Sequence, residues 1–597
     1  MDLSRRRLIQ AGLVSGAAAF LPPLAATAAG AAVPAGLTRF TEPLAVPELL
    51  DLRGGGLGEL WMRNAEHSFH TALGPTRTFA YQSTTGASTY LGPVIVAQRG
   101  TPLTLRVHND LGADGQRHPL ADAIDRDLVP EGSDDADAPR ASVHLHGGNT
   151  EPGSDGGPTE AFLPGHAHDY HYANLQDAAG LWYHDHALGI TRLNVYAGLA
   201  SGYLRHAPGT GIDTGDGAHL PAGDFEVPLI LQDRMFNADG SFAYPGNPDL
   251  GRPWAPEFFG DVATVNGTAW PTLDVARGHY RFRVYNGSNA RFYLLRLAAA
   301  SGSLPFLQIG TDGGLLGAPV PLTKLLLGPG ERADLVVDFS ALPAGSLVRL
   351  TNGARAPYPT GPRAVRRGGS PLADIMQFRA TGAVGHAAPP PASLRATPIT
   401  SLSDFTPKKI RPMALVEVQN AQGVPLTALI NNRRFGAAPT EVARDTLERW
   451  EIVNTTGDAH PIHLHFVQFQ VLDRQKVRSD AYLAACGFLD PSTGLVVPEQ
   501  GEAKDVGPFL YGQTSPPAPH EQGWKDTVVA MPGEVTRIIV PFGAGAVPDK
   551  PLAIGSSFTG TYVWHCHILE HEDNDMMQSF SITRWGDVAL GANLHVV

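Results

Sequence analysis

The chain has 597 residues and a formal net charge of −13 at pH 7. This acidic balance favours solubility and excludes a role in nucleic-acid binding. At roughly 150 residues per domain the length corresponds to about four domains, and 67 glycines and 50 prolines suit short strands joined by turns. After the N-terminus, no apolar run is long enough to cross a membrane as a helix.

The first 28 residues are expected to form an export signal. Residues 4–9, SRRRLI, precede an alanine-rich apolar stretch that ends in Ala26-Thr27-Ala28, a small-residue cleavage site. The pattern resembles a twin-arginine signal, which implies recognition by the twin-arginine export machinery. An ordinary secretory signal or a disordered basic tail are the alternatives. We expect a bacterial protein that acts in the periplasm or outside the cell.

Residues 40–210 are predicted to form the first domain, which contains two histidine pairs. His144 and His146 are two residues apart in VHLHG, and His184 and His186 have the same spacing in WYHDH. Because alternate residues of a strand share one face, each pair can present two imidazoles to one site. The acidic segment 125–137 that precedes the first pair is predicted to be a solvated loop.

Three strand-like runs that end in Asn recur at domain-sized intervals. They begin at residues 105, 282 and 450, which are 177 and 168 residues apart. Histidine pairs follow the first and third runs, whereas residues 291–295, RFYLL, follow the second. We therefore expect a middle domain without metal ligands at 222–380, a proline-rich linker at 381–400 and a third domain at 401–597.

The third domain carries a candidate copper site. Cys566 lies between His565 and His567 in the same predicted strand, so it points to the opposite face. Together with His571 and Met576 it supplies three of the four ligands of a blue-copper site, which are one thiolate, two imidazoles and a thioether. We assign His460 as the fourth ligand. It is an odd number of residues from His463 and His465, with a proline between.

Same-face histidine pairs give eight imidazoles in all. These are too many for one tetrahedral zinc ion and suit a cluster of copper ions. A single pair is more often two hydrogen-bonded surface histidines, but four pairs with a cysteine inside one of them favour the metal interpretation. The pairs are 144/146, 184/186, 463/465 and 565/567.

The motifs HLHG, WYHDH, HPIHLH and WHCHILEHEDNDMM resemble those of the multicopper oxidases, a family of three-domain cupredoxins. Further stretches, INNRRF and GWKDT among them, are similar to the subgroup of bacterial spore-coat laccase, bilirubin oxidase and phenoxazinone synthase. The match runs from about residue 40 to the C-terminus. It implies an all-β fold of three tandem cupredoxin-like Greek-key β-sandwich or barrel domains.

The resemblance also implies four copper ions and the residues that bind them. A type 1 copper would be bound by His460, Cys566, His571 and Met576, and a type 2 copper by His144 and His463. A coupled type 3 pair would be bound by His146, His184, His186, His465, His565 and His567. An acidic proton relay is implied at Glu572 and Asp155.

Two classes of function are compatible with these ligands. The first is a laccase-like oxidase that couples one-electron oxidation of a phenolic, aminophenolic or bilinoid reductant to reduction of dioxygen to water. The second is a copper-handling protein, either a cuprous-ion oxidase or a copper-resistance binder. Cuprous-ion oxidases of the family tend to carry methionine-rich segments, because soft thioethers suit Cu(I). The chain has only 8 scattered methionines, which favours the organic reductant.

The remaining candidate residues receive a structural interpretation. Cys486 and Cys566 are the only cysteines, so assigning Cys566 to copper leaves no intramolecular disulfide and Cys486 as a buried free thiol. His166, His168 and His171 have a metal-like spacing but lie outside the four copper motifs, and we do not expect them to bind metal. The sequence does not determine how segment 476–522 folds relative to the type 1 site.

Overall fold

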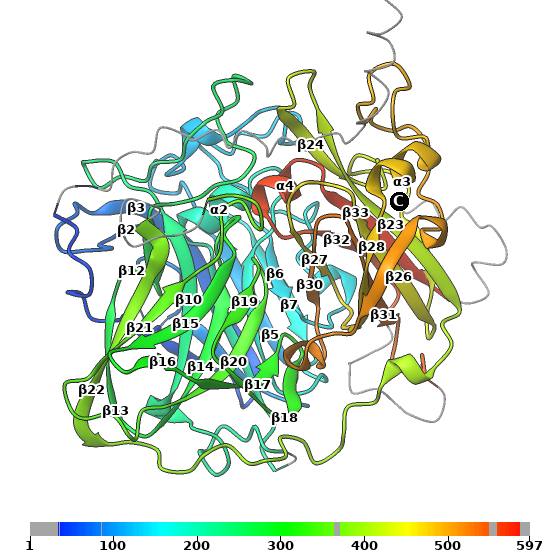
Figure 1. Ribbon diagram of the computed structural model, residues 1–597. Helices are drawn as coiled ribbons and strands as arrows, with labels where there is room; N and C mark the ends of the chain where they lie inside the picture. The colour runs from blue at the N-terminus through cyan, green and yellow to red at the C-terminus, as the bar shows by residue number, and fades with distance from the viewer. Residues whose placement is uncertain are drawn as a thin grey trace, which may run out of the picture.

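The computed structural model describes residues 34, 36–84, 86, 88–209, 211–362, 371–547 and 558–584. The predicted signal, 1–28, lies outside these residues. Within them, β-strands dominate and form six sheets, two in each third of the chain (Figure 1). The all-β prediction is therefore confirmed. None of the helices in this described part is long and apolar enough to cross a membrane.

The first two sheets enclose a core that includes Leu60, Val107 and Leu181. Their strand orders are β1-β4-β9-β8-β6 and β3-β2-β5-β7. In β5 buried and half-buried residues alternate, as expected for a strand with one face on the core. The strands are β1 (Leu49–Asp51), β2 (Gly56–His67), β3 (Thr76–Gln82), β4 (Val94–Gln98), β5 (Leu103–Asn109), β6 (Val143–His146), β7 (Ala167–Tyr172), β8 (Ala179–Asp185) and β9 (Ala200–His206).

The middle pair of sheets packs around a core that includes Phe282, Phe339 and Phe378. The orders are β12-β11-β10-β14-β20-β17-β18 and β13-β22-β21-β15-β16, with β19 on β15. The strands are β10 (Glu226–Arg234), β11 (Val262–Val265), β12 (Thr268–Ala269), β13 (Thr272–Arg277), β14 (His279–Asn286), β15 (Tyr293–Ala299), β16 (Gly302–Leu304), β17 (Phe306–Thr311), β18 (Gly314–Leu322), β19 (Leu325–Leu327), β20 (Arg332–Asp338), β21 (Leu347–Asn352) and β22 (Asp374–Val384).

The last pair of sheets, drawn yellow to red in Figure 1, has the orders β24-β23-β26-β31-β28-β29 and β25-β33-β32-β27-β30. Its core includes Trp450 and Trp564 and also contains Cys566 and Met576. The strands are β23 (Lys409–Gln419), β24 (Pro425–Ile430), β25 (Thr440–Ala443), β26 (Leu447–Asn454), β27 (His460–Leu464), β28 (Gln470–Val477), β29 (Leu510–Ser515), β30 (Thr527–Ala530), β31 (Glu534–Pro541), β32 (Gly560–Cys566) and β33 (Met577–Thr583).

The sequence repeat has a structural cause, a buried asparagine at the ends of β5, β14 and β26. In each case its side-chain amide donates to two backbone carbonyls and its carbonyl accepts from the N–H two residues later. Such a residue satisfies three backbone groups where the chain leaves the sheet. The contacts are Asn109 with Pro139, Phe162 and Leu111, Asn286 with Arg291, Leu327 and Ser288, and Asn454 with Asp458, Ala530 and Thr456.

Each of the short α-helices lies between two consecutive strands of one sheet. The N–H groups of Thr191 and Arg192, at the start of α2, donate to the carboxylate of Asp573 at the end of α4, which joins the first and last pairs of sheets. Cys486 ends α3 and is a buried free thiol, as predicted. The helices are α2 (Thr191–Ala197), α3 (Ser479–Cys486) and α4 (Leu569–Asp573), with 3-10 turns η1 (Ala121–Ala123), η2 (Pro152–Ser154), η3 (Gly223–Phe225), η4 (Pro371–Ala373), η5 (Leu402–Asp404), η6 (Gly507–Phe509) and η7 (Pro519–Glu521).

The prediction of a solvated acidic loop at 125–137 is wrong in part. Asp125 is 6% exposed and accepts hydrogen bonds from Trp254 and Arg252 of the middle domain. Asp135 is 2% exposed and forms an ion pair with Arg140. The acidic composition suggested solvation, but donors compensate the buried carboxylates. Those of Asp125 are distant in the sequence, whereas that of Asp135, Arg140, lies close to it in the chain.

Trp450 should be a main contributor to the stability of the last domain. Its fully buried ring contacts Trp564, Phe542 and Phe580. Trp450→Ala should lower the free energy of unfolding by about 3–5 kcal/mol, because it leaves a cavity. Ile410→Ala, at a side chain that is 47% exposed, serves as the control in the same chemical denaturation experiment. Equal losses for the two variants would contradict this interpretation.

Candidate metal centre

Three side chains of the last domain converge in what we call the cysteine cluster, His460, Cys566 and His571. Sγ of Cys566 lies 3.5 Å from Nδ1 of His460 and 3.7 Å from Nδ1 of His571. His460 begins β27, Cys566 ends β32 and His571 lies on α4. One ligand atom from each of the three lies within 4.8 Å of the other two. One thiol and two imidazoles at this spacing can hold a copper ion.

Neighbouring groups orient these donors. The Oγ1 of Thr456 lies 2.7 Å from Nε2 of His460, so the imidazole presents Nδ1 to the thiol. The N–H of Ile568 donates to Sγ of Cys566 over 3.5 Å. Met576 is fully buried in the same core, and its carbonyl accepts from the N–H of Cys566. The structure therefore brings the predicted methionine next to the cysteine in the fold.

Eight histidines form a second group, the histidine cluster, at the interface of the first and last domains. The first-domain pairs come from β6 and β8, where His144 lies opposite His184. The last-domain pairs come from β27 and β32, where His463 lies opposite His565. The donor atoms gather in overlapping sets, His144/His146/His463, His146/His184/His567 and His186/His465/His565. As alternation predicts, β32 directs Cys566 to one cluster and His565 to the other.

The facing nitrogens of the histidine cluster require a cation. Nε2 of His144 lies 3.4 Å from Nε2 of His463, yet both rings donate from Nδ1 to backbone carbonyls, those of Asp155 and Asp526. Neither Nε2 therefore carries a proton, and two lone pairs face each other. Nε2 of His565, whose Nδ1 donates to a carbonyl, has the same relation to Nε2 of His465 over 3.2 Å. A metal ion between such pairs removes the repulsion, so the residues fit bound copper.

Burial keeps these imidazoles neutral. All eight side chains are buried, and desolvation lowers the pKa of each below its ordinary value, to about 4 for His186 and His565. Desolvation also lowers the pKa of His571 in the cysteine cluster to about 4. Neutral imidazole is the form that binds a metal, so the folded protein presents its ligands without the loss of a proton at neutral pH.

Carboxylates surround the histidine cluster on several sides. Oδ2 of Asp155 lies 2.7 Å from Nδ1 of His465. Glu572 is buried, with its oxygens 3.4 Å from Nδ1 of His186 and 3.1 Å from Nδ1 of His565. Both residues predicted from the family pattern therefore contact ring nitrogens that face away from the cluster. Such contacts orient metal-binding histidines.

Sequence reasoning missed Asp526. Its backbone carbonyl and its carboxylate contact His463 and His146, one histidine from each domain. It lies within the GWKDT stretch, which was noted for its resemblance but given no role. Charge alone could not distinguish it from the other acidic residues of the chain.

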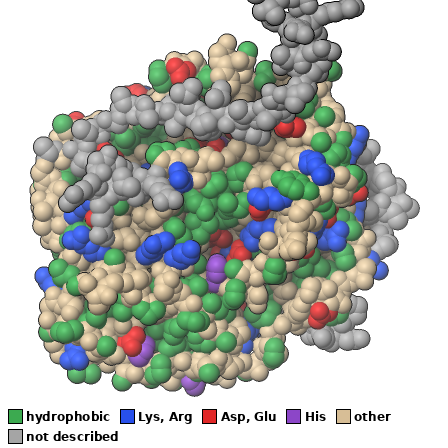
Figure 2. Space-filling model, viewed as in Figure 1, with side chains coloured by type: hydrophobic (Ala, Val, Ile, Leu, Met, Phe, Trp, Pro, Cys, Tyr) green, Lys and Arg blue, Asp and Glu red, His purple; other side chains and the backbone are tan. Residues whose placement is uncertain are grey.

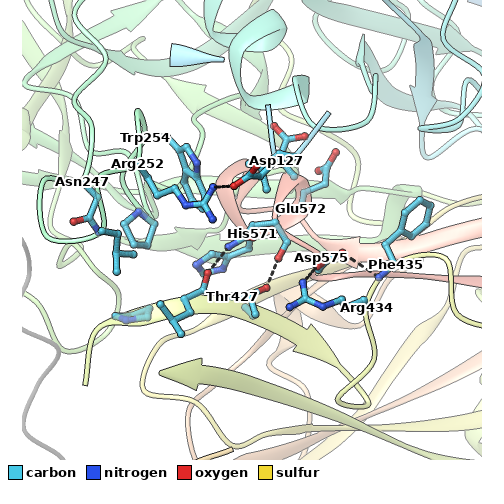
Figure 3. Close-up of a pocket in the computed structure, with 18 of the residues that line it drawn as sticks. Asp127, Asn247, Arg252, Trp254, Thr427, Arg434, Phe435, His571, Glu572 and Asp575 are labelled. Atoms are coloured by element: carbon cyan, nitrogen blue, oxygen red, sulfur yellow. Dashed lines mark hydrogen bonds and ion pairs between the residues drawn. The ribbon is translucent and has the colours of Figure 1, made fainter. Parts of the chain in front are cut away.

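A cavity of about 540 Å³ adjoins the cysteine cluster at His571. Its wall combines apolar side chains, Trp254 and Phe435 among them, with two ion pairs (Figure 3). Arg252 pairs with Asp127 and Arg434 with Asp575, each over 2.6 Å. Charges of both signs and hydrophobic side chains are also interspersed on the face shown in Figure 2. His571 is 9% exposed and Cys566 fully buried, so the imidazole is the part of the cluster nearest to solvent.

Segment 476–522, whose place the sequence left open, contributes no residue to this cavity among those described. It packs instead around a separate core with Tyr482 and Cys486. His168 and His171, two of the first-domain histidines with a metal-like spacing, make their contacts outside both clusters. His168 contacts the carbonyl of Gly153, and His171 contacts Thr104.

Comparisons with known proteins agree with this geometry. A family model described as "Multicopper oxidase" matches residues 404–584. A laccase from Bacillus subtilis (strain 168) is 36% identical over 92% of this chain and 99% of its own length. Multicopper oxidase LPR1 from Arabidopsis thaliana is 34% identical over 88% of each chain. The structure of the McoA multicopper oxidase from Aquifex aeolicus matches with a TM-score of 0.69 and 24% identity, over 92% of this chain and all of that one.

The chain therefore belongs to the multicopper oxidase family and is a copper-dependent oxidoreductase. The structural match is to a fold with cupredoxin-like domains. The predicted domain boundaries at 40–210, 222–380, 381–400 and 401–597 stay predictions. The first and last pairs of sheets lie within 40–210 and 401–597, whereas β22 of the middle pair runs to Val384, past the predicted boundary at 380.

The copper-free protein should lose stability as the pH falls below about 6.5. The folded-state pKa of His186, His565 and His571 is about 4, against an ordinary value of 6.5. Between these values the unfolded chain binds protons that the folded chain does not, which costs about 1.4 kcal/mol per pH unit for each histidine. Above pH 7 both states are neutral and the effect vanishes.

Thermal unfolding of copper-free protein between pH 4 and 8 measures this dependence. The midpoint should be nearly constant above pH 7 and should fall below it. His186→Gln removes one of these histidines and should make the fall less steep. An equally steep fall in the variant would show that other groups cause it.

Proposed function

We propose that this protein is a laccase-like oxidase that takes electrons one at a time from a small organic reductant and reduces dioxygen to water. The observation that carries the proposal is that neighbouring residues at the end of one strand supply ligands to both clusters. β32 presents Cys566 to the cysteine cluster, while His565 and His567, its neighbours in the chain, belong to the histidine cluster. Bound copper would supply the one-electron chemistry and the site where dioxygen reacts.

The ligands divide between four copper ions in this proposal. A type 1 ion would be held by His460, Cys566 and His571, with Met576 as the fourth ligand. His144 and His463, the first of the two pairs whose lone pairs face each other, would hold the type 2 ion. The other two donor sets would hold the type 3 pair, one with His146, His184 and His567 and the other with His186, His465 and His565.

The cavity beside His571 is the proposed binding site of the reductant. Its volume of about 540 Å³ lies within the range of about 300–1,000 Å³ common for small-molecule sites. Trp254 and Phe435 offer apolar faces for an aromatic ring, as a phenol, an aminophenol or a bilinoid pigment would need. The electron would leave the reductant at the edge of His571, because Cys566 behind it is closed to solvent.

The copper-handling alternative has weaker support. Among the described residues, no methionine lines the cavity, so a cuprous ion would find no soft thioether there. Steady-state rates with a phenolic dye and with Cu(I) discriminate between the two functions. The export signal, the twin-arginine machinery as its partner and a periplasmic or extracellular location stay predictions from the sequence.

The type 1 assignment predicts a blue protein. Copper-loaded wild type should show intense thiolate-to-copper absorption, and Cys566→Ser should lose that band and at least 99% of dye oxidation, because the serine hydroxyl is a poor soft donor. Cys486→Ser, at the other buried cysteine, is the matched control and should stay blue. Retention of the band in Cys566→Ser would contradict the assignment.

Asp155 and Glu572 are the proposed proton relay. Both are buried, and both contact ring nitrogens of the histidine cluster, so each would hold a proton beside the site where copper would supply the chemistry of dioxygen reduction. Glu572→Gln keeps the shape but cannot release a proton. It should slow reoxidation of reduced enzyme by dioxygen by roughly 10²-fold and leave the blue band unchanged.

Glu570→Gln is the control for the relay. Glu570 is equally buried, but its carboxylate contacts Tyr244 and Asn289 rather than the histidine cluster. Stopped-flow reoxidation should distinguish the two variants. Equal rates for Glu572→Gln and wild type would assign Glu572 a purely structural role.

A further inference from the structure

Asp526 contacts one histidine from each of the two domains that form the histidine cluster. Its backbone carbonyl accepts from Nδ1 of His463 over 2.9 Å, and Oδ1 accepts from Nε2 of His146 over 3.0 Å. The residue directly precedes β30, which pairs with β27, the strand of His463. Asp526 is fully buried, so these contacts are closed to bulk water.

The bond to His146 reverses the orientation of that ring. His144, His184, His463, His465 and His565 all make their outward hydrogen bond through Nδ1. In His146, Nε2 makes this bond and Nδ1 turns inward, 3.2 Å from Nε2 of His567. An imidazole that donates from Nε2 has its lone pair on Nδ1, so Asp526 determines which nitrogen can bind metal.

Arg332 holds Asp526 in place from the middle domain. Its Nη1 and Nη2 donate to Oδ1 and Oδ2 of Asp526, each over 2.6 Å, in the two-bond geometry that an arginine forms with a carboxylate. Burial alone would raise the pKa of Asp526, but the charge and hydrogen bonds of Arg332 hold it well below its usual range. Arg332 donates to both oxygens, the arrangement that an ionised carboxyl group accepts, so Asp526 acts as the acceptor for the N–H of His146.

Two glycines show how closely the chain is packed here. A Cβ on Gly147, which follows His146, would lie 2.5 Å from both Nη2 of Arg332 and Oδ2 of Asp526. A Cβ on Gly330, two residues before Arg332, would lie 2.6 Å from the ring of His567. Both glycines also have positive φ angles, +83° and +80°. The turn at 330–332 thus lies against His567 of the cluster at Gly330 and against Asp526 at Arg332.

We propose that Arg332 and Asp526 are positioning residues of the histidine cluster, through which the middle domain, itself without ligands, keeps His146 in the orientation that binds metal through Nδ1. The inference rests on the proposed function, since it concerns copper at that cluster. It makes the middle domain a part of the metal centre rather than a spacer.

Asp526→Asn tests the carboxylate. Its oxygens accept hydrogen bonds from His146, Arg332 and Thr527. The Nδ1–H of His463, which donates to the backbone carbonyl of Asp526, also lies 3.5 Å from Oδ1. The side-chain NH₂ of the new asparagine would face one of these donors, so two N–H groups would point at each other. His146 can relieve this conflict by carrying its proton on Nδ1 instead of Nε2. The proton then blocks Nδ1, the nitrogen that binds metal. Loss of an outer hydrogen bond to a metal-binding histidine typically lowers metal affinity about 10–100-fold. We expect that loss at the histidine cluster, with the blue band of the cysteine cluster unchanged.

The probe is Cu(II), titrated into copper-free protein in competition with a chelator. Bound copper is counted per chain, and the electron paramagnetic resonance spectrum separates type 1 from type 2 copper. Arg332→Lys keeps the positive charge but cannot form two parallel bonds, so it should show the same selective loss. Arg281→Lys is the matched control. Arg281 is an equally buried arginine of the middle domain with two parallel bonds to Asp213, away from the metal ligands.

Selective loss of copper from the histidine cluster in Asp526→Asn and Arg332→Lys, with Arg281→Lys like wild type, supports the proposal. Wild-type copper content, affinity and type 2 spectrum in both test variants would overturn it. If Asp526→Asn does not fold, Arg332→Lys decides alone, with thermal unfolding of the copper-free form as the check on folding. Failure of the wild type to bind copper at the cluster would instead refute the proposed function.

Discussion

Eight neutral imidazoles, buried at an interface with their lone pairs facing, form the constraint on which the rest of this structure depends. Without a cation, facing lone pairs such as those of His144 and His463 repel each other, and burial removes both rings from bulk water. The histidines come from the first and last domains, so a metal bound there also joins these domains. Metal binding and the assembly of the domains are therefore coupled.

The constraint explains the groups that surround the cluster. Backbone carbonyls and the carboxylates of Asp155, Glu572 and Asp526 face the outward ring nitrogens. They fix the tautomers of these rings, and Asp526 supplies negative charge near a site meant for cations. Asp526 in turn requires Arg332, since an isolated buried carboxylate would be costly. The middle pair of sheets supplies no predicted ligand, yet through Arg332 it stabilises the Asp526 carboxylate beside the histidine cluster.

Separation of the two clusters follows from the geometry of one strand. β32 directs the thiol to a core near the cavity and the neighbouring imidazoles to the domain interface, so a short stretch of backbone links the two clusters. His571 forms the boundary between the cysteine cluster and the cavity. A small organic molecule can therefore approach the cysteine cluster while the histidine cluster stays buried.

The sequence by itself determined the strand fold, the repeated unit with its terminal asparagine, and the residues of both clusters, because these depend on spacing along a strand. Parity alone separates Cys566 from His565. Only the tertiary structure decided which nitrogen of His146 faces inward, how the six type 3 candidates divide into two sets, and that Asp125 is buried. These features depend on partners such as Arg332 and Trp254, which are far away in the chain. No local pattern encodes such contacts, since they arise only when the domains pack.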